Sequence, residues 1–224
     1  MSATDQRYRT AENLHVARRA EDLYKGVQDN RGAAVGALAR LRRAASTEIG
    51  EDPAAWQVAF LGYPVPDDDR DYPSAGEKAV YLALTLFALH QQSKSEPMHI
   101  KDGPTLGAAL SRLARVNGSE DPSDPVIRRF NALVTADTEP ETRWHLRSLV
   151  GQLRAHGISL DYGRLADDLA VLNGYHRRTE SADQARRRVQ LRWSRDFSRA
   201  PKSDTESGPE TEPEAGPDPA LRTD

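Results

Sequence analysis

The sequence predicts an all-α protein, and three observations support this fold class. Apolar residues recur at spacings of three and four through most of the chain, as on one face of a helix. Helix start and stop signals bracket these segments. No run alternates apolar and polar residues as a strand would, and no Asn-Gly pair joins two strand-like runs.

Helical spacing predicts nine segments along the chain. Their approximate residue limits are 7–27, 32–45, 52–60, 74–90, 106–116, 124–135, 140–156, 161–173 and 181–197. Four starts carry a polar cap followed by proline, or by Glu or Gln three positions on: Asp52 with Pro53, Ser74 with Glu77, Asp124 with Pro125, and Ser181 with Gln184. The run Val80–His90 is apolar on several faces, which predicts a helix buried on most sides.

The chain divides by charge. Residues 201–224 hold seven acidic and two basic residues and five of the fourteen prolines, so their formal charge is −5 and residues 1–200 carry +2. A proline-rich acidic segment with little to bury predicts disorder. We therefore predict two small helical bundles, residues 1–98 and 99–200, followed by a disordered acidic tail at 201–224. The segment 116–123 is the alternative boundary between the bundles.

Several classes of function are disfavoured. The chain has no cysteine, which removes disulfides, thiolate metal sites and a cysteine nucleophile. Its six histidines lack metal-binding spacing, and no phosphate-binding glycine loop or serine-nucleophile motif occurs. The longest apolar run is too short for a membrane span, and no signal sequence stands at the N-terminus. We expect a cytoplasmic protein that is not an enzyme and uses no cofactor or metal.

Arginine is the unusual component, with 26 arginines against five lysines. A GC-rich coding sequence explains such an excess as well as function does, so placement has to decide. In segment 32–45 the apolar residues share one face, Arg40 and Arg43 point away from it, and Arg42 flanks it. Outward arginines recur on later segments, at Arg112, Arg128, Arg129, Arg147 and Arg154. Such faces suit phosphate binding, although a merely solvated helix face gives the same pattern.

Seven blocks, in this order, resemble a known family: LARLRR, LTLFALHQQ, LGAALSRL, IRRFNALVTAD, HLRSLVGQLR, LDYGRLADDL and VQLRWSRDF. Their pattern is similar to that of the CasB family, the small subunit of the type I-E CRISPR surveillance complex, Cascade. The resemblance spans Val35 to Phe197. It implies a non-catalytic, all-helical subunit that helps to hold the guide RNA and the opened DNA.

The resemblance also implies partners and contact residues. The expected partners are the CRISPR guide RNA, the target and displaced DNA strands, the backbone and large subunits of Cascade, and a second copy of the chain. The expected phosphate-binding residues are Arg40, Arg42, Arg43, Arg112, Arg128 and Arg129, with Arg143, Arg147 and Arg154 as further candidates. The alternative is a helical scaffold whose arginines bind acidic protein surfaces and never touch nucleic acid.

Overall fold

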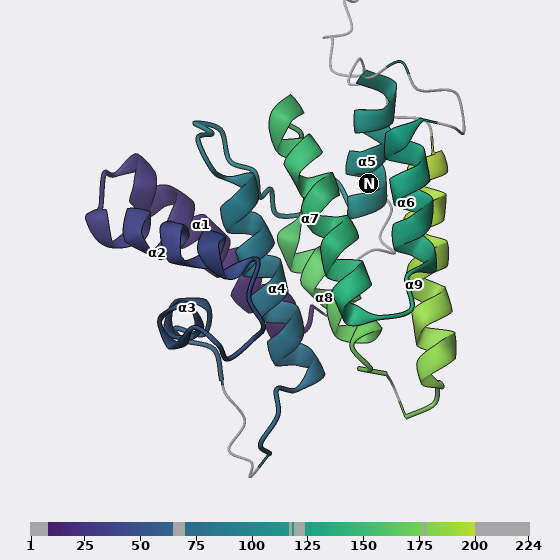
Figure 1. The fold of residues 1–224 in the computed structure, drawn as a ribbon, viewed down its shortest axis with the longest axis horizontal. Helices are drawn as coiled ribbons and strands as arrows, with labels where there is room; N and C mark the ends of the chain where they lie inside the picture. Colours follow the sequence, from purple (N-terminus) through teal and green to yellow (C-terminus); the bar gives the residue numbers. More distant parts are fainter. Residues whose placement is uncertain (1–8, 65–69, 117, 119–123, 177, 200–224) are drawn as a thin grey trace, which may run out of the picture.

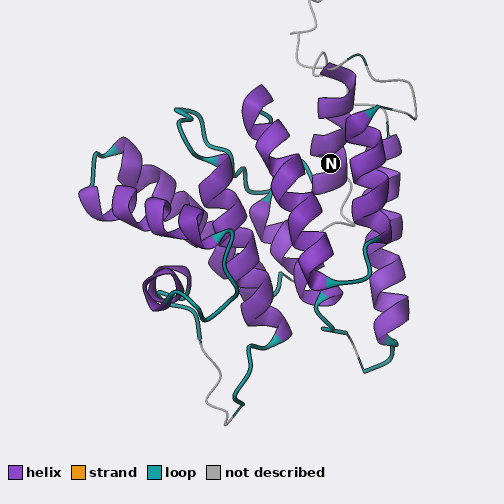
Figure 2. Cartoon of the chain, in the orientation of Figure 1, coloured by secondary structure: helices purple, strands orange, loops and turns teal. Residues whose placement is uncertain are grey.

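The computed structural model describes residues 9–64, 70–116, 118, 124–176 and 178–199. The predicted tail at 201–224 lies outside these residues. The described part of the chain consists of α-helices joined by loops (Figures 1 and 2), with one isolated backbone bridge between His99 and Leu160 in place of any strand. The all-α prediction is confirmed.

The helices that the structure describes are α1 (Ala11–Gln28), α2 (Gly32–Ala44), α3 (Pro53–Ala59), α4 (Ala75–His90), α5 (Leu106–Val116), α6 (Pro125–Thr135), α7 (Glu139–His156), α8 (Tyr162–Leu172) and α9 (Ala182–Ser198). Each corresponds to one predicted segment. The largest difference is at the first, where α1 begins at Ala11 after its cap Thr10.

The predicted caps form as hydrogen bonds. The Ser74 hydroxyl accepts from the Glu77 amide (3.1 Å), and the Glu77 carboxylate accepts from the Ser74 amide (2.7 Å). Ser181 and Gln184 form the same reciprocal pair at the start of α9. These contacts satisfy backbone donors that a helix leaves unpaired at its N-terminus, so the local sequence is enough to define where the helices begin.

Helix α4 occupies the centre of the fold (Figure 1), in contact with α1, α2, α7 and α8. It is apolar on nearly every side, and all but three of its sixteen residues are buried. Leu84 and Phe87 are fully buried among these neighbours. The prediction of a helix buried on most sides is confirmed, because an apolar surface that surrounds a helix has to be covered all round.

Helix α8 joins the early and late parts of the chain, since it packs against α1, α4 and α9. A continuous set of buried apolar side chains runs from Val16 in α1 to Trp193 in α9. The division into bundles of residues 1–98 and 99–200 stays a prediction, and the core itself is contiguous across that boundary.

Buried polar contacts tie α8 to its surroundings. His90 Nδ1 at the end of α4 lies in hydrogen-bond contact with the Tyr162 hydroxyl (3.0 Å), and the Tyr162 amide donates to His99 Nδ1 (3.1 Å). Burial lowers the pKa of His90 to about 4, so this ring is neutral at physiological pH. Further along α8, the Asp168 carboxylate accepts a hydrogen bond from the Trp193 indole nitrogen (2.6 Å) and pairs with Arg192, both on α9.

Candidate nucleic-acid interface

Two arginines of α2 face solvent without an acidic partner among the described residues. Leu38 and Leu41 are buried on the inner side of this helix. Arg40 and Arg43 lie on the other side, both exposed, and no described residue forms an ion pair with either. Arg42 is half-buried at the edge of the apolar face. The helix-wheel prediction for this segment is therefore correct.

Three candidate arginines share one side of α7, because Arg143, Arg147 and Arg154 are separated by four and seven residues. Their environments differ. Arg147 is exposed, and no described residue pairs with it. Arg154 is half-buried, and its Nη1 donates to the Gln92 side-chain oxygen (2.7 Å).

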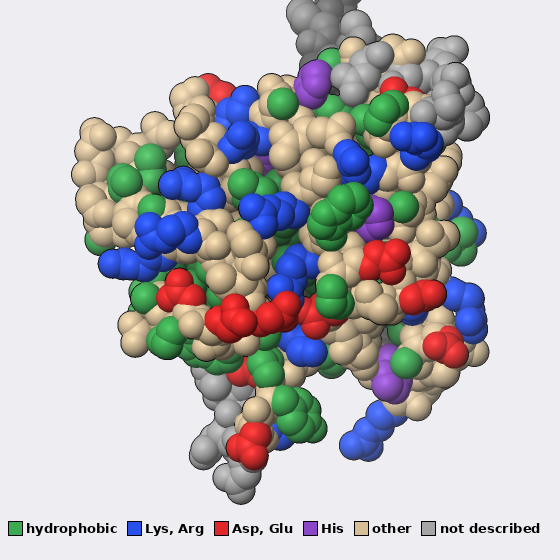
Figure 3. Space-filling model, in the orientation of Figure 1, with side chains coloured by type: hydrophobic (Ala, Val, Ile, Leu, Met, Phe, Trp, Pro, Cys, Tyr) green, Lys and Arg blue, Asp and Glu red, His purple; other side chains and the backbone are tan. Residues whose placement is uncertain are grey.

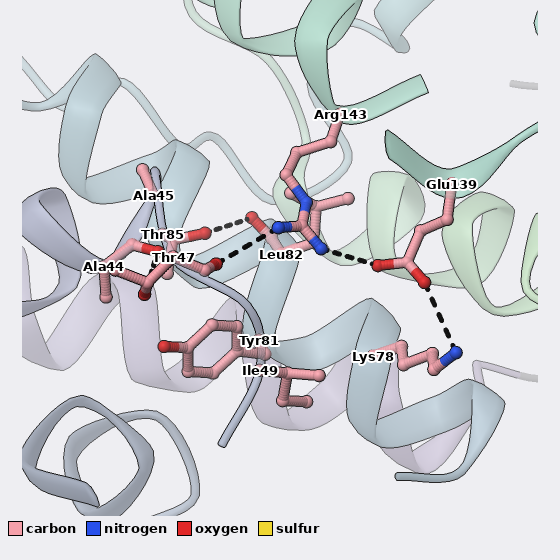
Figure 4. Close-up of a pocket in the computed structure, with 10 residues that line it drawn as sticks. All are labelled: Ala44, Ala45, Thr47, Ile49, Lys78, Tyr81, Leu82, Thr85, Glu139 and Arg143. Carbon is pink, nitrogen blue, oxygen red and sulfur yellow. Dashed lines mark hydrogen bonds and ion pairs between the residues drawn. The ribbon is translucent and has the colours of Figure 1, made fainter. Parts of the chain in front are cut away.

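Arg143 is engaged inside the protein (Figure 4). Its guanidinium donates to the Thr47 carbonyl (3.1 Å) and to Glu139 (2.7 Å), which also pairs with Lys78 (3.3 Å). It also donates to both carboxylate oxygens of Glu48 (3.1 Å each). Burial raises the pKa of Glu139, but the hydrogen bonds from Arg143 and the charge of Lys78 outweigh it and hold the pKa below its usual value. Arg143 therefore connects α7 to the segment after α2 and to α4.

A cavity beside Arg143 is too small to be a ligand site. Its walls come from the end of α2 and the segment after it, from α4 and from the first two turns of α7, and include Thr47, Tyr81 and Glu139 (Figure 4). Its volume of about 10 Å³ is roughly what one water molecule requires. A nucleotide needs tens of times that space, so this cavity cannot hold one.

The remaining candidates lie on α6 and α5. Arg128 is exposed, whereas Arg129 is half-buried with its guanidinium 5.8 Å from the centre of the Trp144 ring on α7. Arg112 on α5 is exposed. It stands one turn before Arg115, which donates to the Arg199 carbonyl at the end of α9 (2.9 Å). The structure thus brings Arg129 beside α7, and it leaves Arg128 exposed on α6 and Arg112 on the helix that packs against α9.

One face of the molecule presents much of this positive charge. Figure 3 shows Lys and Arg side chains gathered over α2 and over the neighbouring edge of α7, above a row of acidic side chains. The separation of the two signs means that the basic area is not neutralised within its own surface. An anionic chain that crosses α2 and α7 would meet guanidinium groups first.

Trp144 lies on the surface, whereas the sequence groups it with Leu149 and Leu153 as an apolar residue of this helix. Trp144 is 61% exposed, although His145 and Leu146, which follow it in the sequence, are buried. A helix wheel predicts this exposure. Nine positions separate Trp144 from the buried Leu153, and at about 100° for each position the two side chains lie on opposite sides of the helix.

Two further properties can be stated for the part of the chain that the structure describes. No three side chains of the His, Asp and Glu types come together there in a way that could hold a metal ion. None of the helices described is both long and apolar enough to cross a lipid bilayer.

Comparison with known proteins adds to this geometry. The sequence model of the family described as CRISPR-associated protein Cse2 matches residues 37–197, which is most of the chain. The chain belongs to the Cse2 family. This confirms the resemblance to CasB, and Cse2 membership indicates a subunit of the CRISPR Cascade complex.

Solved structures agree with the Cse2 assignment. CasB from Thermobifida fusca is similar with a TM-score of 0.66 and 29% identity over 85% of this chain and 99% of that one. A Cse2-family protein from Thermus thermophilus is similar with a TM-score of 0.56 and 27% identity over 81% and 96% of the two chains. CasB from M. ruber, 22% identical with a TM-score of 0.56 over 80% and 91%, shares the Cse2 fold. No curated protein sequence matches the chain significantly.

Proposed function

We propose that this Cse2-family chain is a non-catalytic Cascade subunit that stabilises the guide RNA and the opened target DNA through sequence-independent contacts between arginines and phosphates. The observation that carries the proposal is a set of exposed guanidinium groups, at Arg40 and Arg43 on α2 and Arg147 on α7, which pair with no described residue. Both helices pack against α4. The other Cascade subunits and a second copy of the chain would complete the path of the nucleic acid.

The chemistry of these groups suits a phosphate backbone. A guanidinium presents several donors in a planar fork that matches the oxygens of a phosphate, and it stays charged at any physiological pH. Phosphates are alike along every strand, so such contacts carry no sequence information. Base pairing between guide and target would supply the sequence choice, and this subunit would hold the strands that the pairing separates.

Six of the nine predicted arginines can be given distinct roles in this proposal. Four of them are exposed and available to phosphate on α2, α6 and α7: Arg40, Arg43, Arg128 and Arg147. Arg112 is also exposed, on α5. Arg143 has used its donors within the protein, and we assign it the role of positioning α7 against the segment after α2.

The test is a charge-reversed triple variant, Arg40→Glu, Arg43→Glu and Arg147→Glu, assembled with the other Cascade subunits. We expect normal assembly and a shortened opened region in strand-specific footprinting of the target DNA. The matched control reverses three exposed arginines that lie on or just before α9, Arg178→Glu, Arg187→Glu and Arg195→Glu, with the same change in net charge.

Each result decides between the two functions. A shortened region with the triple variant and a normal one with the control would support phosphate contacts at α2 and α7. Normal opening with the triple variant would overturn the proposal in favour of a protein scaffold. Equal loss with both variants would also overturn it, because total charge rather than this surface would then control opening.

A further inference from the structure

We propose that Trp144 is a stacking platform for one unpaired base of a single strand, with guanidinium groups beside it for the phosphates on either side of that base. The inference rests on the proposed function and names the contact that the α6 and α7 surface would make. The observation behind it is the juxtaposition of an exposed indole with Arg129 on α6 and Arg147 on α7.

The three tryptophans of the chain differ sharply in environment. Trp193 is buried in the core and Trp56 is half-buried, whereas Trp144 is 61% exposed. A tryptophan buries more apolar surface than other residues when it packs inside, so an exposed one gives up a large stabilisation. Exposure of this ring on an ordered helix suggests that a partner covers it.

Two neighbours hold the ring in place. The Arg129 guanidinium lies 5.8 Å from its centre, and the His145 ring lies edge-on to it with centroids 4.8 Å apart and planes at 76°. His145 is itself buried. A ring fixed in this way loses little conformational freedom when a flat partner settles on it, which makes it a suitable platform.

The charges around the ring favour an anionic partner. Arg147 lies three residues after Trp144 on α7, a spacing that makes two side chains neighbours on a helix surface. Arg128 is exposed next to Arg129 in the sequence. Glu141 is the exposed acid one turn earlier on α7, and its carboxylate accepts from the Asp137 amide (3.3 Å). Asp137 is exposed as well, so three guanidinium groups stand against two carboxylates and leave a small excess of positive charge.

Trp144 stands alone as an exposed apolar ring on α6 and α7, and this favours a single base as its partner. Among the described residues of α6 and α7, Trp144 is the exposed large hydrophobic residue, and the others lie on different elements. Tryptophan and arginine also occur together at protein interfaces, so a protein contact is the competing occupant that the experiment below has to separate. A single flat ring bordered by cations matches the way that single strands are bound, by base stacking and backbone charge without sequence preference.

Tryptophan fluorescence tests the contact directly. In a Trp56→Phe background the two remaining indoles are Trp144 and the buried Trp193, so a change in the solvent-exposed emission reports on Trp144. We expect oligothymidylate to quench this emission. We also expect Trp144→Ala to weaken binding of the full chain about tenfold, while Trp144→Phe keeps most of the affinity.

The matched control is Tyr175→Ala, which removes an exposed aromatic ring (54% exposed) outside α6 and α7 and should leave affinity unchanged. Circular dichroism should show the same helix content in all variants. Equal loss with Trp144→Ala and Tyr175→Ala would overturn the platform.

The remaining outcomes separate this inference from the proposed function. Oligothymidylate binding with unchanged Trp144 emission and unchanged affinity of Trp144→Ala would overturn the platform and leave the proposed function intact. If the free chain does not bind the oligonucleotide, the same variants are compared in assembled Cascade. There, normal opening with Trp144→Ala overturns the platform, and reduced opening rescued by Trp144→Phe supports it. A blue shift of Trp144 emission on adding the other subunits without nucleic acid would overturn it in favour of a protein contact.

Discussion

Arg143 and Glu48 meet through two parallel hydrogen bonds of 3.1 Å, each from one guanidinium nitrogen to one carboxylate oxygen, across 95 positions of sequence. The Arg143 side chain is only 15% exposed, whereas Arg147, one turn further along α7, is exposed and has no acidic partner among the described residues. Two arginines on the same side of one helix therefore differ in role, since Arg143 makes internal contacts and Arg147 faces solvent. Substitutions at the two positions should affect stability differently.

We predict that Arg143→Ala lowers the free energy of unfolding by about 2 kcal/mol, because it removes charge-assisted hydrogen bonds from a largely buried guanidinium to the half-buried Glu139 and the exposed Glu48. Arg147→Ala should change it by less than about 0.5 kcal/mol, as exposed substitutions usually do. Urea unfolding followed by circular dichroism measures both. Equal stability of the two variants would show that the Arg143 contacts contribute no more than surface charge.

Glycines in two helices provide a second comparison. A Cβ on Gly107 of α5 would lie 2.3 Å from the Trp193 carbonyl oxygen of α9, closer than atoms can approach. We predict that Gly107→Ala destabilises the protein by about 1–3 kcal/mol, since α5 and α9 must move apart. Gly151→Ala on α7, where a Cβ meets nothing within 4 Å, should instead stabilise it by about 0.5–1 kcal/mol. Thermal unfolding of the two variants should therefore shift in opposite directions.

Most of the fold could be predicted from the sequence because its signals are local. Capping pairs such as Ser74 with Glu77 lie three residues apart, and the apolar stripe of each helix is contained within that helix. The assembly of the helices is not local in this sense. Contacts of α8 with α1 and α4 depend on surfaces that no single segment shows, so the sequence could suggest a division at residue 98 but could not establish it.

The candidate site could be predicted only in part, for the same reason. The wheel of α2 places Arg40 and Arg43 outside correctly, because a helix has to bury its apolar face. A helix wheel shows only neighbours within one helix, so the wheel of α7 could not predict that Arg143 pairs with Glu48, 95 positions away. The wheel of α7 does predict that Trp144 is exposed. The residue type predicts the opposite, because tryptophan is highly buried on average.

The buried His90 predicts how stability depends on pH. Its pKa is lowered by burial to about 4 in the folded protein, against about 6.5 when unfolded. Between these values the unfolded chain binds a proton that the folded chain does not, so stability falls as the pH falls through this window. His15 and His99, whose pKa values burial also lowers, act in the same direction. The pKa of Asp168, raised by burial to about 6, opposes them.

A variant isolates the contribution of His90. We predict that His90→Gln, which keeps a polar contact for Tyr162 but cannot titrate, loses less stability than the natural protein between pH 7 and pH 4. The difference should reach about 3 kcal/mol at the acidic end, as a shift of this size implies. Chemical unfolding at a series of pH values measures it, and subtraction removes the effect of Asp168 and the other histidines. Parallel curves for the two proteins would show that His90 is not the sensitive group.

The charge difference between the ends of the chain leads to the last prediction. Residues 201–224 carry a formal charge of −5, and residues 1–200 carry +2. An acidic segment tethered to a mildly basic surface competes with phosphates for the same arginines. We predict that deletion of residues 201–224 strengthens binding of single-stranded oligonucleotides at low salt. The gain should shrink at physiological ionic strength, where exposed charges are screened over about 8 Å.

A chain of the same length separates charge from bulk. In this control the seven acids of residues 201–224 are replaced by Asn and Gln, so the segment remains but its negative charge does not. Electrostatic competition predicts that the deletion and the neutralised chain gain equally. A gain from the deletion alone would mean that the segment blocks access by its volume, because only the deletion removes it. Unchanged affinity of both at low salt would mean that the acidic residues do not reach the arginines of α2 and α7, and that this surface is open to phosphate in the complete chain.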